Sequence, residues 1–170
     1  MDNGPAEIRQ ADLASEEFAA LIDTHKQLML EHSPPESSHA LLVDGLRDPG
    51  ITVWEMRRRG VLVGCGALKV LSASHGEIKS MHTLAALRGL GLGRQMLKHI
   101  IKEAGLRGYD RLSLETGSMD GFHPARRLYE AYGFTYCSPF SGYAEDPNSV
   151  FMTLELGANH DRLSRETEAE

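Results

Sequence analysis

The sequence has few cysteines and no long apolar run, and each scarcity argues against a class of protein. Only two cysteines occur in 170 residues, Cys65 and Cys137. They lie far apart in apolar surroundings, so we expect small hydrophobic residues rather than metal ligands. No stretch approaches the ~20 apolar residues of a membrane span. The start, MDNGPAEIRQ, has no basic and apolar regions typical of a signal peptide, so we expect a cytoplasmic protein without a membrane partner.

Basic residues are also in deficit. The chain has 18 Lys and Arg against 24 Asp and Glu, for a net charge of −6, which argues against a nucleic-acid partner. The acidic balance fits a cationic substrate, and solubility explains it equally well. The eight histidines form no H-x-x-x-H motif or His–acid cluster, so we predict no metal site. His25 lies on an apolar helical stripe and is interpreted as a core residue.

Hydrophobic periodicity and turn residues divide the rest of the chain into alternating elements. Strands are predicted at residues 7–11, 51–56, 61–71, 76–84, 110–115 and 149–156. Helices are predicted from Ser15 to the Pro34–Pro35 break, from Ser37 or Ser38 to Leu42, from Gly91 to a stop at Gly105, and over 123–134. This order predicts one α/β (α+β) domain with a mixed sheet, followed by a polar C-terminal tail.

A glycine-rich stretch, ALRGLGLGRQML at residues 86–97, follows the strand at 76–84 and opens a helix. The first turn of a helix leaves backbone N–H groups unpaired, and the helix dipole adds partial positive charge there. Gly89, Gly91 and Gly93 would let an anion approach those amides, and Arg88 and Arg94 could add charge. The pattern matches neither G-x-G-x-x-G nor a P-loop, so it indicates a phosphate site of another type. A plain tight turn is the alternative.

Two motifs together resemble one known family. R-x-x-G-x-G, from Arg88 to Gly93, directly follows an apolar strand. HPARRLYEAYGF, at residues 123–134, is similar to the signature A-x-x-L-Y-x-x-x-G-F. Both patterns, in this order, resemble the GCN5-related N-acetyltransferase (GNAT) family over roughly residues 6 to 156. The resemblance implies a single GNAT-like domain at residues 3–158, with a mixed, mostly antiparallel sheet of about six to seven strands flanked by helices. Residues 159–170 would form the tail.

The resemblance implies acetyl-CoA as co-substrate. In the family, the strand before the glycine-rich loop parts from its neighbour, and its free backbone groups hold the pantetheine and acetyl group. The expected cofactor-binding residues are Met81, His82 and Thr83 from the strand end and, for the pyrophosphate, Arg88, Gly89, Leu90, Gly91, Leu92, Gly93 and Arg94. The family often has an asparagine three residues before the helix alanine, but Phe122 stands there in this sequence.

Three residues are candidates for the proton transfers that acetyl transfer to an amine needs. By resemblance, Tyr129 matches the tyrosine near the CoA sulfur and is expected to protonate the leaving thiolate; a core aromatic is the alternative. Glu77, at a strand start, matches the base glutamate of lysine-acetylating members, although a surface pair with Lys79 also explains it. Glu115, ranked after Glu77, is a second base candidate; an exposed strand-end carboxylate is the alternative reading.

Two loops are expected to bind the acceptor. In the fold that the resemblance implies, HSPPESSHALL forms one wall of the acceptor pocket, which makes His32, Ser37 and His39 substrate candidates. Tyr143, in PFSGYAEDPNS, lies opposite in many relatives. Each of these residues could equally belong to an ordinary surface loop.

The expected function is transfer of an acetyl group to a primary amine of a small molecule or amino acid. The alternatives are a non-catalytic acyl-CoA-binding module and a protein lysine or N-terminal acetyltransferase. The sequence leaves open whether the chain forms a homodimer.

Overall fold

The computed structural model describes residues 4–157 of the chain. The predicted domain limits, 3 and 158, and the predicted tail at 159–170 lie outside these residues and stay predictions. The strands are β1 (Glu7–Gln10), β2 (Ile51–Arg58), β3 (Val61–Ser72), β4 (His75–Thr83), β5 (Arg111–Gly117), β6 (Thr135–Cys137) and β7 (Ser149–Glu155). The α-helices are α1 (Glu16–His32), α2 (Val43–Leu46), α3 (Leu92–Leu106) and α4 (His123–Ala131). Short 3₁₀ turns occur at Pro35–Ser37, Ala85–Leu87 and Asp120–Phe122.

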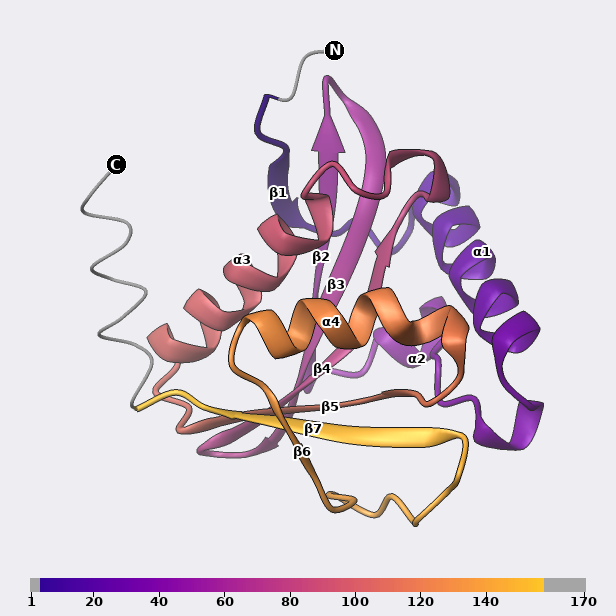
Figure 1. Cartoon of the computed structure of the whole chain (residues 1–170). Coiled ribbons are helices and arrows are strands. Elements are labelled where there is room, and N and C mark those ends of the chain that lie inside the picture. Colours follow the sequence, from indigo (N-terminus) through magenta and orange to yellow (C-terminus); the bar gives the residue numbers. More distant parts are fainter. Residues whose placement is uncertain (1–3, 158–170) are drawn as a thin grey trace.

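The strands form one sheet in the order β1-β2-β3-β4-β5-β7-β6. All neighbours are antiparallel except β4 and β5, which run parallel. The prediction of a mixed, mostly antiparallel sheet of six to seven strands is therefore confirmed. β4 and β5 pair only from His75–Arg111 to Glu77–Ser113, and then the two strands part. Figure 1 shows β2–β4 rising steeply while β5 and β7 run almost horizontally.

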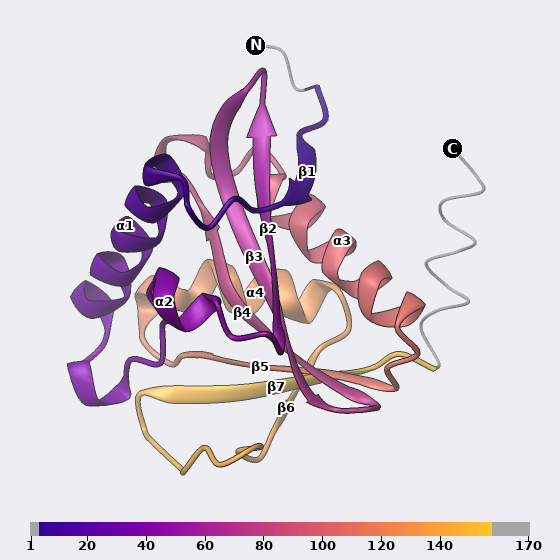
Figure 2. The same cartoon turned by 180° about the vertical axis from the view of Figure 1, so that it is seen from behind.

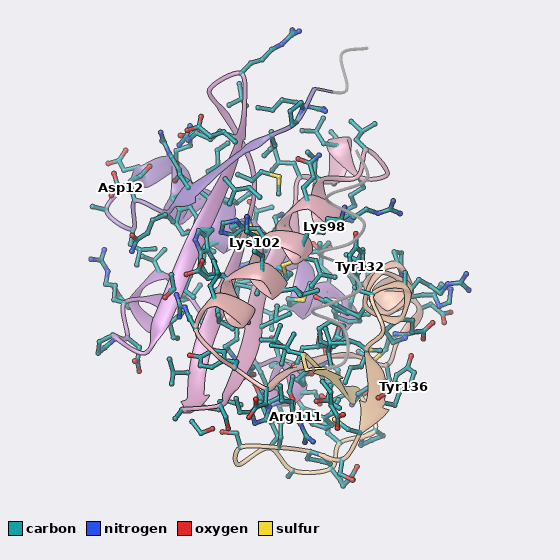
Figure 3. All side chains as sticks on the ribbon, turned by 90° about the vertical axis from the view of Figure 1, so that its left-hand side faces the viewer. Asp12, Lys98, Lys102, Arg111, Tyr132 and Tyr136 are labelled. Atoms are coloured by element: carbon teal, nitrogen blue, oxygen red, sulfur yellow. The ribbon has the colours of Figure 1, made fainter. Side chains whose placement is uncertain are left out.

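Helices cover both faces of the sheet. Figure 1 shows α3 and α4 in front of it, and the reverse view in Figure 2 shows α1 and α2 on the other face. The apolar stripe of α3 predicts this burial, since Leu97, Ile100 and Ala104 are fully buried against the sheet. Phe18 and Ile22 of α1 fill a second apolar cluster on the opposite face. Lys98 and Lys102 lie on the exposed side of α3 (Figure 3).

The start of α1 agrees with the sequence, because the Ser15 hydroxyl accepts a hydrogen bond from the Phe18 amide at 3.3 Å. The predicted end of α3 is wrong. The helix runs through Gly105 to Leu106, and Gly108, with φ of 77°, makes the left-handed turn that follows. A glycine inside a helix costs about 1 kcal/mol, which packing of the apolar stripe easily offsets.

The second predicted helix is also misplaced. Residues 38–42 are not helical, and the short helix α2 begins at Val43. Leu41 and Val43 pack against the apolar cluster below α1, so tertiary contacts decide the local structure here. Strand β6 was not predicted, because three residues carry too little periodicity to be read as a strand. Within residues 4–157, no helix is long and apolar enough to cross a membrane.

Candidate active site

The glycine-rich segment connects the end of β4 to the start of α3. Gly89 and Gly91 have φ of 82° and 81°, a backbone conformation that favours glycine, and Gly91 is the N-cap residue of α3. No side chain caps this helix start, and no acidic residue lies in its first turn. The free amides and the dipole therefore make a site suited to an anion. An added Cβ at Gly89 or Gly91 would meet no protein atom within 4 Å.

A large cavity of about 550 Å³ adjoins this helix start. All seven residues from Arg88 to Arg94 line it, as do Met81, His82 and Thr83. The structure thus brings together every residue that the sequence predicts to bind the cofactor. Helix α1 contributes Leu28 and His32 to the opposite wall, and α4 contributes Pro124 and Leu128. A cavity of this size, with a helix N-terminus at one side, fits a long phosphorylated ligand such as CoA.

A β-bulge interrupts β4 beside this cavity. The register with β3 shifts between Cys65–His82 and Ala67–Lys79, so both Ser80 and Met81 stand opposite Gly66. Ser80 has φ of 53°, which is a strained value for a residue other than glycine. Its carbonyl accepts a hydrogen bond from the Cys65 thiol at 3.2 Å. Because pairing with β5 ends at Glu77, the edge of β4 that faces β5 has no strand partner beyond that point, and backbone groups on this edge can meet a ligand.

A smaller cavity of about 120 Å³ lies between the parted strands β4 and β5. Glu77 to Met81 line one side of it, and Glu115 to Gly117 line another. Its remaining walls come from α1 and the loop after it, from Phe122 and α4, and from Tyr143. Six residues line both cavities: His25, Met29, Met81, Phe122, Ala125 and Tyr129. The two cavities therefore meet beside the bulge.

Tyr129 stands at this junction on α4. Its side chain is 6% exposed, and its ring packs edge-on against Phe134 with 5.7 Å between ring centres. Burial raises the pKa of Tyr129 far above its usual value, and the charge of Glu115 adds to the shift. The phenol is therefore protonated throughout the neutral range and can donate a hydrogen bond.

The two candidate bases differ in their surroundings. Glu77 is buried, and its Oε1 accepts hydrogen bonds from the Tyr143 hydroxyl at 2.6 Å and from Lys79 Nζ at 3.2 Å. The pair with Lys79 is thus largely enclosed and not a surface pair. Burial raises the pKa of Glu115, and the like charge of Glu77 adds to this shift. The raised pKa makes Glu115 a better proton acceptor than an ordinary exposed carboxylate.

A buried histidine pair joins α1 to the end of β4. The Nδ1 atoms of His25 and His82 lie 3.1 Å apart, so one of them donates to the other. Burial, helped by the positive charge of Arg88, lowers the pKa of His25 to about 3 and that of His82 to about 4. Both rings are therefore neutral at working pH. His25 is buried as predicted, yet it also lines both cavities, which its place on an apolar stripe did not reveal.

The four substrate candidates divide between the cavities. Ser37, His39 and Tyr143 line the smaller cavity, while His32 lines the larger one. The His32 ring packs edge-on against Phe122, with 5.9 Å between ring centres. Lys79 is a site residue that the sequence indicated only as a partner of Glu77. Within residues 4–157, no group of three or more His, Cys, Asp or Glu side chains could hold a metal ion.

The parted parallel strand pair and the uncapped glycine-rich helix start agree with what the resemblance to the GNAT family implies, and comparisons with known proteins identify that family. The chain belongs to the acetyltransferase (GNAT) family, whose model matches residues 14–134. It is 54% identical over 149 residues to the uncharacterized N-acetyltransferase YsnE of Bacillus subtilis, covering 88% of this chain and 99% of that one. It is 39% identical over 124 residues to an IAA acetyltransferase of Azospirillum brasilense, covering 72% and 80%.

A solved structure shares the fold. The GNAT family acetyltransferase of Elizabethkingia anophelis, which has acetyl-CoA bound, superposes with a TM-score of 0.66 at 21% identity. The match covers 92% of this chain and 100% of that one.

Proposed function

We propose that this protein transfers an acetyl group from acetyl-CoA to a primary amine of a small molecule or amino acid. The observation that carries the proposal is the junction of the two cavities at Met81 and Tyr129. One cavity has the glycine-rich helix start that suits a pyrophosphate, and the other has carboxylates that suit an amine. A thioester and an amine held from the two sides would meet at that junction.

The residues around the larger cavity would hold acetyl-CoA. Amides between Gly89 and Arg94 would bind the pyrophosphate, and the free backbone of β4 near Met81 would bind the pantetheine and the thioester oxygen. Acetyl-CoA supplies the acetyl group as an activated thioester. The open space above Gly89 and Gly91 supports this fit, because a side chain at either position would project where no protein atom lies.

In the smaller cavity we propose Glu115 as the base that takes the proton of the acceptor ammonium. Its raised pKa favours this role, whereas the Glu77 carboxylate is already occupied by two donors. This reverses the order favoured by the sequence. Glu77 would instead position Tyr143 and Lys79. We propose Tyr129 as the proton donor to the departing thiolate, because its buried side chain lines both cavities.

The direct test is acetyl transfer to a panel of primary amines, comprising amino acids, their amides and simple alkylamines. Release of the CoA thiol is followed with a chromogenic disulfide, and the product is identified by mass. We expect thiol release that depends on the amine, with one acetyl group gained per thiol released. Binding of acetyl-CoA without transfer to any amine would contradict the proposal and favour a non-catalytic binding module.

A further inference from the structure

The outer wall of the smaller cavity is built from two loops that are far apart in the sequence. One follows α1 at residues 33–42, and the other joins β6 to β7 at residues 138–148. Asn148 Nδ2 donates a hydrogen bond to Ser37 Oγ at 3.3 Å, and the His39 and Tyr143 rings meet edge-on with 5.0 Å between centres. Figures 1 and 2 both show the loop after α1 beside the start of β7. The two loops thus bridge over the cavity.

The side of the bridge that carries Tyr143 is firmly held. The Tyr143 hydroxyl donates to Glu77 at 2.6 Å and accepts from Lys79 at 3.0 Å. Its ring lies 5.2 Å from the Phe140 ring and 5.4 Å from the Phe151 ring, so aromatic contacts support it from behind. Tyr143 is therefore held both by its hydroxyl and by its ring, and it forms a fixed part of the cavity wall.

The other side of the bridge is anchored independently. Lys26 Nζ of α1 donates to the Ala40 carbonyl at 2.9 Å, which ties the loop to its helix. Ser37 is only 4% exposed, and the ring of Pro35 fixes the backbone just before it. Each loop is therefore held without the other, and their contact joins two walls of the cavity.

The space beside this bridge is small. A water molecule needs roughly 10–15 Å³ of such space, so a cavity of about 120 Å³ holds on the order of ten non-hydrogen atoms. We infer that the acceptor is a free small amine of about that size, and that the bridge made by Ser37, His39, Tyr143 and Asn148 excludes peptide chains. This inference rests on the proposed function and names the substrate class of the same site.

The test compares acceptors that share one amine and differ only in length. An amino-acid amide accepted in the panel is measured against the tri- and pentapeptide amides that begin with the same residue. We expect kcat/KM of the wild-type protein to fall at least 100-fold from the amino-acid amide to the pentapeptide amide. Tyr143→Ala opens the wall and should raise the ratio of long to short acceptor at least tenfold. Asn148→Ala removes one neutral hydrogen bond and should raise it about threefold.

Tyr136→Ala is the matched control, because this tyrosine lies on β6, is 54% exposed and lines neither cavity (Figure 3). It should leave the ratio unchanged. Equal use of short and long acceptors by the wild type would overturn the inference and leave the proposed function intact. So would an unchanged ratio in both bridge variants, each shown by circular dichroism to be folded. If no amine of any length is acetylated, the proposed function fails and the inference fails with it.

Discussion

Two buried glutamates have similar local surroundings in the sheet but differ in the strand pairing around them. Glu55 on β2 and Glu77 on β4 are each followed two residues later by a cation, Arg57 and Lys79. Glu55 Oε1 accepts from Arg57 Nε at 2.8 Å and from Arg9 Nε at 2.7 Å. Glu77 Oε1 likewise accepts from two donors. The sequence pattern and the local hydrogen bonding are thus nearly the same.

The strand pairing around the two residues differs. Glu55 faces Arg9 on β1 and Cys65 on β3, and both ladders continue on either side of it. Glu77 faces Ser113 on β5 at the last paired position before the strands part, and a cavity opens there. An ion pair enclosed by continuous sheet serves stability. The same pair at the point where the sheet divides lies beside a second carboxylate, Glu115, and an open space that a substrate can fill.

The largest loss of activity is expected when the hydroxyl of Tyr129, which lines both cavities, is removed. Tyr129→Phe keeps the ring and its packing against Phe134, so the fold and acetyl-CoA affinity should survive. Because general acid catalysis contributes about 10²–10⁴ in rate, kcat should fall by that range. Steady-state kinetics and calorimetric titration of acetyl-CoA measure the two quantities separately. Full activity in a folded variant would exclude the acid role, and loss of the fold would make the tyrosine structural.

Replacing Glu115 sharpens the comparison between the two carboxylates of the cavity. A base must be ionised to accept a proton, so the wild-type rate should rise with pH through the raised pKa of Glu115. Glu115→Gln should lower kcat/KM by about 10² and abolish that dependence. Glu77→Gln should lower kcat/KM less and should keep the pH dependence, because this change removes a positioning group. The pH–rate profiles of both variants decide, and the opposite pattern would restore Glu77 as the base.

Glu55 lies where the pairing of β1, β2 and β3 is continuous, so Glu55→Gln should lower stability without impairing catalysis. Burial opposes ionisation of Glu55, but hydrogen bonds from Arg57 and Arg9 lower its pKa below the usual value. A carboxylate whose pKa is lowered by folding contributes stability that is complete above its unfolded pKa, about 4.3, and lost as pH falls through the folded value. Denaturant unfolding at pH 7 should show a loss of about 1.5–3 kcal/mol, the usual contribution of hydrogen bonds to a charged group.

The loss should shrink as pH falls below about 4, because the wild-type carboxylate then becomes neutral as well. The variant should retain its kcat at pH 7. A loss of stability that did not vary with pH would mean that the charge of Glu55 is not what stabilises β1 and β2.

The sequence predicted more of the geometry of the larger cavity than of the smaller one, for a physical reason. Glycine is the residue type that favours a left-handed backbone, so Gly89 and Gly91 could be recognised from the sequence. The apolar stripe of α3 likewise predicts which face of the helix is buried. The smaller cavity depends on where β4 and β5 stop pairing and on a bulge at Ser80, and neither feature can be recognised from a residue type. The contact of His25 with His82 joins residues 57 positions apart, so no local pattern could reveal it.

The smallest effect expected is at the helix start, where glycine strain and ligand space can be separated. Gly91 and Gly108 have φ of 81° and 77°, and an added Cβ at either would meet no protein atom within 4 Å. Alanine at either position therefore carries the same left-handed strain, about 1–2 kcal/mol, without a steric clash inside the protein. Gly108 follows the far end of α3 and lines neither cavity.

Gly91→Ala and Gly108→Ala should therefore lose similar stability in thermal unfolding, but only Gly91→Ala should bind CoA more weakly. Its methyl group would occupy space beside the amides that we propose for the pyrophosphate, and we expect about a tenfold rise in Kd, equivalent to about 1.4 kcal/mol. Calorimetric titration of CoA into both variants measures this difference. Equal CoA affinity in the two would show that the ligand does not approach the start of α3, and would remove the main support for the larger cavity as the cofactor site.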